Sequence, residues 1–367
     1  MSDIHVNRLA RVAEALDRAD IDLMLLGPEA DTFYLTGFEH GHAAERLLAF
    51  VVRRDGSAAW ISPSMNVAQI REHASPNAPI YAWTDAETYL PALREVIGDA
   101  RSVAFDDEAR AAFLLDLLEV APGIRPVKAG AFMRRLRVRK DADELRALRH
   151  AATQVDQAIA EAVNLCRATR RESEVDQELR RLLGGDEQVA FTIVAAGKNS
   201  ALPHHETGPD TLEPGDIVIL DFGTRYRHYH SDITVTCSVG EPADPEVRQV
   251  YRIVWEAQQK ALEAIRPGVP CEAIDRAARE HIAAAGYGDF FLHRTGHGLG
   301  LQVHEPPYLV AGNTEPLEEG MVFSVEPGIY LTGRFGVRLE VITAVGSTGA
   351  ELINAPSAPE LPIAPQP

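Results

Sequence analysis

Two carboxylates embedded in apolar, strand-like sequence constrain this chain of 367 residues more than any other feature. Residues 217–236 read IVILDFGTRYRHYHSDITVT, so Asp221 follows one apolar run and Asp232 precedes the next. An ionised carboxylate within an apolar strand is costly unless a partner compensates its charge. A turn would explain one such residue. Two of them on consecutive strands of a predicted hairpin instead favour a shared cation.

Three later segments supply further candidate ligands. Residues 293–305, HRTGHGLGLQVHE, place His297 between two glycines, which let the backbone approach a site closely, and His304 follows one strand length later. Glu326 ends the apolar run MVFSVE, and Glu340 interrupts the β-rich segment GVRLEVITAV. Each glutamate alone is also compatible with an edge-strand charge that faces solvent. The alternation of GVRLEVITAV, which we predict to form one strand, argues against that reading for Glu340.

The charge balance of these residues predicts a dinuclear metal site. Two Asp and two Glu side chains bring four negative charges, and they cannot all remain ionised at close range without cations. Two divalent ions would balance them. Oxygen ligands with a single His favour Mn, Co, Zn or Fe, and two such ions close together can activate water and polarise a carbonyl.

The formal net charge of −18 argues against nucleic acids and anionic membranes as partners, because both need a basic surface. The three cysteines form no CxxC pair and indicate no disulfide framework. The sequence has no apolar signal core and no apolar run of about 20 residues. We therefore expect a cytoplasmic protein.

The chain is predicted to contain two domains and a tail. Short strands alternate with helices in residues 1–130, which is typical of an α/β domain. A charged helix, with Asp141 and Glu144 in a capping-box pattern, then opens residues 131–354. Long helices mixed with strands predict an α+β fold around a curved antiparallel sheet there. The Pro-rich residues 355–367 predict a flexible tail.

These residues resemble a known family. The ordered set Asp221, Asp232, His297, Glu326 and Glu340 is similar to the ligands of the methionine aminopeptidase/prolidase/creatinase family, M24. The segments SALPHHE, LDFG, SDIT, HRTGHGLGLQVHE, EPGIY and GVRLE resemble its proline-peptidase branch. Six motifs in the family's order are far more specific than one. The resemblance implies a creatinase-like α/β N-terminal domain followed by a pita-bread α+β catalytic domain.

The same resemblance implies a role for each ligand. Asp221 would chelate one metal ion, Asp232 and Glu340 would bridge both ions, and His297 and Glu326 would complete the two coordination shells. Mn is the expected metal, with Co or Zn as alternatives.

Three residues are expected to act on the substrate. By resemblance, His204 would hydrogen-bond the substrate or the leaving group, and His304 would steady the tetrahedral intermediate. Both roles suit imidazoles, which can donate to a developing oxyanion at neutral pH. Glu326 would carry the proton from the attacking water.

The sequence departs from the family at two places. Val341 stands after Glu340, where many members have Asp or Asn, and we expect this difference to tune the site only. Some archaeal-type dipeptidases carry an Arg shortly after the His-Glu pair, where this chain has Tyr308. A dipeptide carboxylate needs a cation, best an Arg. The candidates are Arg46 (reaching over from the partner subunit of a homodimer), Arg334 and Arg338.

Four functions remain open from the sequence. The chain is predicted to be a prolidase, which cleaves the bond before proline in Xaa-Pro dipeptides. The alternative is an Xaa-Pro aminopeptidase that acts on longer proline-containing peptides. A metal-free creatinase-like hydrolase or lyase and a non-enzymatic binding module share the fold. The five candidate ligands oppose both of the last two functions.

Overall fold

The computed structural model describes residues 3–39, 45–74, 78–185 and 188–365. The chain forms two compact units, Met1–Arg137 and Val138–Pro367. The sequence predicted a domain boundary near residue 130. In the structure the first unit continues to Arg137, because it includes helix α6 (Gly130–Arg137).

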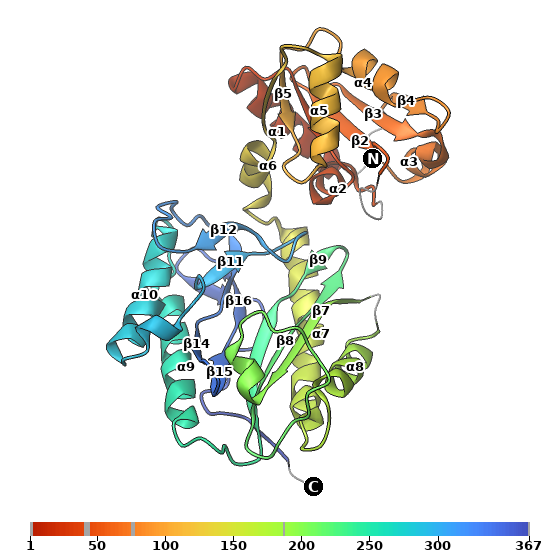
Figure 1. The fold of residues 1–367 in the computed structure, drawn as a ribbon. Helices are drawn as coiled ribbons and strands as arrows, with labels where there is room; N and C mark the ends of the chain where they lie inside the picture. The colour runs from red at the N-terminus through yellow and green to blue at the C-terminus, as the bar shows by residue number, and fades with distance from the viewer. Residues whose placement is uncertain (1–2, 40–44, 75–77, 186–187, 366–367) are drawn as a thin grey trace. The chain divides into compact units, whose positions relative to one another are not determined.

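The N-terminal unit is an α/β layer structure around a six-stranded mixed sheet with the order β4-β3-β2-β1-β5-β6 (Figure 1). Strand β2 pairs antiparallel with β1 and β3, and the remaining pairs are parallel. The strands are β1 (Leu23–Leu26), β2 (Ala49–Arg53), β3 (Ala58–Pro63), β4 (Ile80–Trp83), β5 (Ser102–Phe105) and β6 (Arg125–Lys128). The other helices are α1 (Asp3–Arg18), α2 (Ala30–Thr36), α3 (Val67–His73), α4 (Leu90–Ile97) and α5 (Ala111–Val120).

The second unit, called here the catalytic unit, opens with the long helix α7 (Ala142–Leu165). The predicted capping box is confirmed: the Asp141 carboxylate accepts from the backbone N–H groups of Asp143 and Glu144, both at 2.9 Å. The Glu144 carboxylate in turn accepts from Asp141 N at 2.9 Å. These bonds satisfy donors that a helix start leaves free.

Two mainly antiparallel sheets form the body of the catalytic unit, where the sequence predicted one curved antiparallel sheet. The first contains β7 (Val189–Ala196), β8 (Ile217–Tyr226), β9 (Tyr229–His230), β10 (Ile233–Val239) and β18 (Ile363–Ala364). The second contains β11 (Gly296–Gly298), β12 (Glu305–Leu309), β13 (Val322–Val325), β16 (Val341–Val345) and β17 (Ala350–Leu352). A hairpin joins β14 (Gly328–Leu331) to β15 (Phe335–Arg338). The other helices are α8 (Glu172–Leu182), α9 (Val247–Ala264) and α10 (Cys271–Ala284), and α9 and α10 pack side by side (Figure 1).

The single strand predicted over residues 336–345 is wrong. The segment is divided into β15 and β16, which belong to different sheets. At the break, Glu340 N donates to Thr234 O in β10 at 3.1 Å instead of to a partner of its own sheet. Arg338 ends β15 and Glu340 directly precedes β16, and both are buried.

The predicted flexible tail is also wrong for the described residues 355–365. Two donors on α9 bind its carbonyls: Trp255 Nε1 donates to Ser357 O at 3.2 Å, and the Tyr251 hydroxyl donates to Ala358 O at 2.9 Å. Strand β18 then pairs with β10, and Leu361 is buried. A Pro-rich segment retains its carbonyl acceptors, and here the helix supplies the donors.

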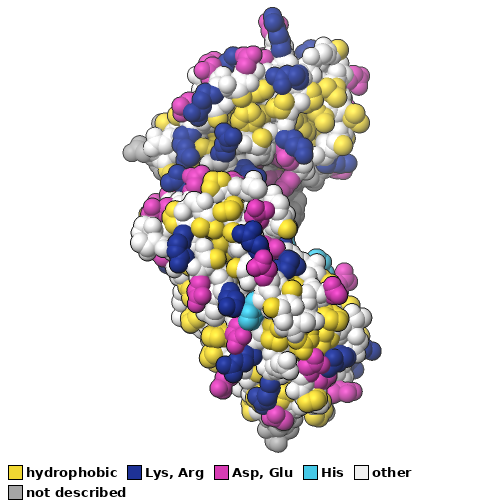
Figure 2. All heavy atoms as spheres, turned by 90° about the vertical axis from the view of Figure 1, so that its left-hand side faces the viewer, with side chains coloured by type: hydrophobic (Ala, Val, Ile, Leu, Met, Phe, Trp, Pro, Cys, Tyr) yellow, Lys and Arg dark blue, Asp and Glu magenta, His cyan; other side chains and the backbone are white. Residues whose placement is uncertain are grey.

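Among the described residues, no helix combines the length and hydrophobicity needed to span a bilayer. On the face of the molecule shown in Figure 2, acidic and basic side chains are interspersed, and no continuous basic stripe is visible.

Candidate metal centre

A cavity of about 610 Å³ lies within the catalytic unit. Every residue predicted to bind metal or to act in catalysis lines it. We call the five candidate ligands the floor: Asp221, Asp232, His297, Glu326 and Glu340. We call three further lining residues the rim: His204, Arg294 and His304.

The first sheet supplies both aspartates of the floor. Asp221 lies within β8, opposite Thr234 of β10, and Asp232 directly precedes β10. At Gly223, between the two aspartates along the chain, a Cβ atom would lie 2.0 Å from Ser231 O. Only glycine therefore permits this close approach of the two strands, which brings both carboxylates to one place.

The second sheet supplies His297 from β11, which lies between β12 and β13 and pairs with both. A Cβ atom would lie 2.0 Å from Ser324 O at Gly296 and 2.2 Å from Pro306 O at Gly298. The flanking glycines are thus required by the neighbouring strands. Because the Gly298 carbonyl can only accept, a neutral His297 would carry its proton on Nδ1, 3.1 Å from that oxygen, and present Nε2 to a metal ion.

The floor residues form overlapping groups whose potential ligand atoms lie within 4.8 Å of one another. One group is Asp221, Asp232 and Glu340, and another is His297, Glu326 and Glu340. His297 Nε2 lies 3.1 Å from Glu326 Oε1 and 3.6 Å from Asp232 Oδ2. These two groups share Glu340.

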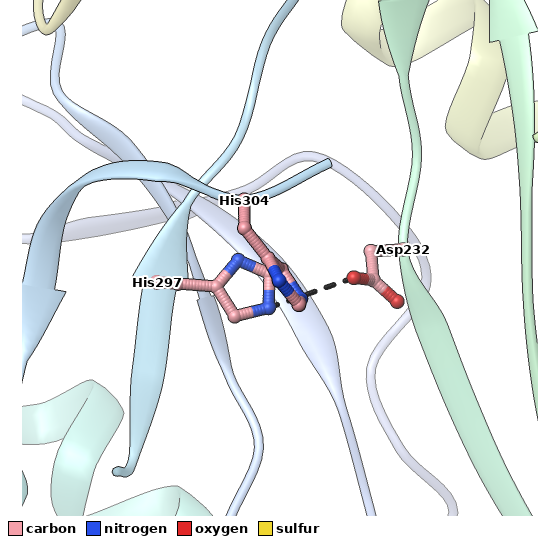
Figure 3. Close-up of side chains that lie close together, drawn as sticks. All are labelled: Asp232, His297 and His304. Atoms are coloured by element: carbon pink, nitrogen blue, oxygen red, sulfur yellow. Dashed lines mark ion pairs between the residues drawn. The ribbon is translucent and has the colours of Figure 1, made fainter. Parts of the chain in front are cut away.

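A third such group consists of Asp232, His297 and His304 (Figure 3). Figure 3 shows the two imidazoles close together, with the Asp232 carboxylate beside them. The ring centroids of His297 and His304 are 4.0 Å apart. His304 of the rim is thus in contact with His297 of the floor.

The electrostatics of the floor are unfavourable for the protein alone. Burial, together with repulsion by neighbouring carboxylates, raises the pKa of Asp232 and of Glu340 well above the ordinary range. Burial also opposes ionisation of Glu326, but the hydrogen bond and charge of His297 outweigh it and lower the Glu326 pKa to about 2. Added positive charge would relieve this repulsion.

Unpaired atoms point to the same conclusion. Within the described part of the chain, Asp221 Oδ1 and Glu340 Oε1 are buried side-chain oxygens that accept no hydrogen bond. Buried acceptors are rarely left without a partner. Two orphaned oxygens in a cluster of four carboxylates and one imidazole fit a pair of divalent cations, which would satisfy both the geometry and the charge.

Three other ligand oxygens accept hydrogen bonds from neighbouring side chains. Arg338 Nη2 donates to Asp221 Oδ2 at 2.6 Å, and its Nη1 donates to the Tyr330 hydroxyl at 2.9 Å. The Thr234 hydroxyl donates to Glu340 Oε2 at 2.7 Å, and the Ser324 hydroxyl donates to Glu326 Oε1 at 3.2 Å. Such outer contacts orient ligands and tune a metal site.

The histidines of the rim differ from the floor in exposure: His204 and His304 are both exposed. Partial burial, with the nearby His297 and Arg294, lowers the pKa of His304 to about 4. Its imidazole is therefore neutral at pH 7 and can donate one N–H to a substrate oxygen.

The predicted substrate-binding arginines lie in three different settings. Arg338 lines the cavity but is buried and bound to Asp221. Arg334 lies outside the lining residues and is paired with Asp244 and Glu246, each at 2.6 Å. Arg46, in the N-terminal unit, makes two bonds of 2.9 Å to Asp85. Tyr308 also does not line the cavity.

Arg294 is the arginine that sequence reasoning missed. It lines the cavity, and its guanidinium carbon lies 4.5 Å from the centroid of the Tyr308 ring. Among the described residues, no carboxylate pairs with it. Only its place in the His- and Gly-rich segment could have indicated it.

Sequence reasoning also missed His293. His293 lines the cavity, and its Nε2 lies 2.7 Å from the Tyr330 hydroxyl. Burial lowers its pKa. In the sequence, His293 resembles any other surface histidine, and only its position before the His297 segment could have indicated it.

Comparisons with known proteins agree with this geometry. The sequence matches metallopeptidase family M24 over residues 146–347 and the creatinase/prolidase N-terminal domain over residues 8–139. It is 39% identical over 359 residues to the probable dipeptidase PepE of Mycobacterium tuberculosis, covering 96% of this chain and 95% of that protein. An Xaa-Pro dipeptidase of Pyrococcus horikoshii is 31% identical over 355 residues, covering 96% and 98%.

A solved structure extends the agreement to the whole fold. The crystal structure of dipeptidase PepE from Mycobacterium ulcerans superposes with a TM-score of 0.93 at 37% identity, covering 99% of this chain and 98% of that one. The expected creatinase-like N-terminal domain and pita-bread catalytic domain are therefore confirmed. Together with the carboxylate and imidazole cluster, these matches show that the chain belongs to metallopeptidase family M24 and is an enzyme of that family.

Proposed function

We propose that this enzyme hydrolyses the bond before proline in Xaa-Pro dipeptides, with two divalent ions held by the floor. The observation that carries the proposal is the shared cavity, which brings the five candidate ligands together with His204 and His304. Its volume of about 610 Å³ is in the range of small-ligand sites and suits a dipeptide.

The floor would hold the ions in the arrangement that the sequence predicts. Asp221, Asp232, His297, Glu326 and Glu340 would supply the ligands, and Glu340 belongs to two of the ligand groups. When bound, the ions would supply a water of lowered pKa and a polarised peptide carbonyl.

The protein's own groups would handle the protons and the substrate. Glu326 is ionised at neutral pH and could accept a proton from the attacking water. His304 would donate its N–H to the carbonyl oxygen as negative charge develops there. His204, on the same cavity, would hydrogen-bond the substrate near the leaving nitrogen.

The proline residue of an Xaa-Pro dipeptide would have partners in the cavity. Its apolar lining includes Phe191, Ile193, Pro203 and Val303, against which a proline ring could pack. Arg294 supplies a cation, and a guanidinium is suited to a carboxylate through paired hydrogen bonds. We therefore assign the terminal carboxylate to Arg294 in place of the three arginines predicted from the sequence.

The proposal also includes Mn as the working metal, a homodimer and a cytoplasmic location. The donor set of carboxylates and one imidazole supports Mn but equally suits Co or Zn. All three cysteines are free and buried, which is compatible with a reducing compartment. Metal analysis of the purified protein and sedimentation would test the first two points.

A paired hydrolysis assay tests the proposed function. The protein would be stripped of metal, reloaded with Mn, and offered Ala-Pro and Ala-Pro-Ala in parallel. Metal-dependent cleavage of Ala-Pro, with little cleavage of the tripeptide, is expected. Preferred cleavage of the tripeptide would instead establish the Xaa-Pro aminopeptidase, and failure to cleave either peptide would reject proline specificity.

A further inference from the structure

Within the part of the chain that the structure describes, the two histidines of the rim have no hydrogen-bond partners of their own. Among the described residues, no side-chain or backbone group bonds to the imidazole of His204 or of His304, and both residues are exposed. The His304 ring contacts the ring of His297. The position of each imidazole therefore depends on the backbone of its loop.

The residue after His204 is anchored to a buried carboxylate. His205 Nε2 lies 2.8 Å from Glu172 Oε2, and the Glu172 side chain is fully buried at the start of α8. Three further donors bind the same carboxylate: Ala196 N at 2.8 Å, Asn199 Nδ2 at 3.0 Å and Gly208 N at 3.1 Å. Glu172 thus ties together the whole turn that carries His204.

The residue after His304 is anchored in a comparable way. Lys140 Nζ lies 2.8 Å from Glu305 Oε1, and the two side chains are only 1% and 4% exposed. Gln302 N donates to the second oxygen of Glu305 at 3.3 Å. At Gly300, a Cβ atom would lie 2.8 Å from Glu305 Oε1 and 3.1 Å from Lys140 Cε, so this loop closes tightly around the ion pair.

We propose that Glu172–His205 and Lys140–Glu305 are positioning pairs, which hold His204 and His304 respectively at the substrate. The inference rests on the proposed function for the roles of the two histidines. A buried charged group is often no more stabilising than apolar residues of the same size, so the buried Glu172 carboxylate and the buried Lys140–Glu305 pair beside the two histidines call for another role. Orientation is such a role, because a displacement of about 1 Å can cost about a hundredfold in rate.

Two variants remove one anchor each while keeping the volume of the side chains. Glu172→Gln weakens the first, and the double substitution Lys140→Met with Glu305→Gln removes the second without leaving one charge buried alone. In each folded variant we expect kcat for Ala-Pro to fall by about ten- to hundredfold, with metal content and KM little changed.

The decisive measurement repeats each anchor variant in a His204→Ala and in a His304→Ala background. A pair that acts through one histidine loses its effect when that histidine is absent. The Glu172 substitution should therefore have no further effect in the His204→Ala background but its full effect in the His304→Ala background. The double substitution at Lys140 and Glu305 should show the opposite pattern.

A matched control removes an ion pair of the N-terminal unit. Arg137 Nη1 lies 2.6 Å from Asp31 Oδ1, and we expect the double substitution Arg137→Met with Asp31→Leu to leave kcat unchanged. Wild-type kcat in a folded anchor variant, or equal losses in both histidine backgrounds, would overturn the inference and leave the pairs a structural role only.

Hydrogen exchange tests the inference independently of peptidase activity. In the metal-loaded protein, the Glu172 variant should speed exchange in residues 202–208, and the Lys140 and Glu305 variant should speed it in residues 299–305. Unchanged exchange in both loops would overturn the inference. If the wild type cleaves no Xaa-Pro dipeptide, the proposed function fails, whereas loop-specific exchange would still support the anchors.

Discussion

The floor and the rim of one cavity are built in opposite ways. Asp221 and His297 of the floor lie within strands, and four of the five floor residues are buried. The rim residues His204 and His304 are exposed and lie outside the regular strands and helices. Groups that hold cations gain from a rigid, dry setting, whereas groups that meet a substrate must remain accessible.

The largest expected effect comes from the floor. Asp221→Asn and Glu340→Gln should each reduce hydrolysis to the detection limit and release metal, because each removes a charge and a ligand. Metal content by mass spectrometry and Ala-Pro hydrolysis would be measured on the same preparations. Full activity in either variant would contradict the ligand assignment.

Without metal, a substitution in the floor should not lower thermal stability, in contrast to its effect on activity. Glu340 is buried and repelled by Glu326 and Asp221, and its pKa is raised. Without metal, Glu340→Gln should therefore unfold at the same or a higher temperature than the wild type at pH 7. After loading with Mn, the order should reverse, because only the wild type gains the full binding energy. Thermal melts with and without Mn would show this crossing, and a variant less stable in both states would argue against cation binding at Glu340.

The rim should lose rate without losing metal. His304→Ala removes one donor to the developing oxyanion, a change that typically costs about a hundred- to a thousandfold in kcat. Since His304 is exposed and outside the predicted ligand set, metal content should stay close to that of the wild type. Loss of metal in this variant would move His304 into the ligand set, as its proximity to Asp232 and His297 allows.

The same contrast explains what could be predicted from the sequence. The floor was predictable because a charge in an apolar strand, such as Asp221 in IVILDFG, has few explanations other than a bound partner. The capping box at Asp141 and the alternation of the N-terminal domain were visible for the same reason, since local patterns carry them.

Long-range contacts account for what could not be predicted. At the break between β15 and β16, Glu340 N donates to Thr234 O, more than 100 positions away, and the local alternation of the sequence cannot predict this bond. Glu172 resembles any acidic residue in a first helical turn until His205 is placed beside it. The tail was predicted flexible from its prolines, but the donors that bind it lie on α9.

A substitution of Arg294, in the rim, should affect substrate binding and leave the rate of hydrolysis nearly unchanged. Arg294→Met should raise the KM for Ala-Pro by about ten- to a hundredfold with kcat little changed, because a charge-assisted hydrogen bond contributes about 1.5–3 kcal/mol. Ala-Pro amide, which lacks the carboxylate, is the matched substrate and should be insensitive to the substitution. An equal loss for both substrates would reject the assignment of the carboxylate to Arg294.

Arg334→Gln should have the smallest effect, and it tests whether position in the cavity, more than residue type, makes an arginine functional. Arg334 is exposed, lies outside the cavity lining, and pairs with Asp244 and Glu246. Exposed ion pairs contribute little, so kcat/KM for Ala-Pro should change by less than about twofold. A rise in KM for the dipeptide, without a rise for its amide, would instead transfer the carboxylate from Arg294 to Arg334. Assays of the two arginine variants side by side therefore decide which arginine binds the terminal carboxylate of the dipeptide.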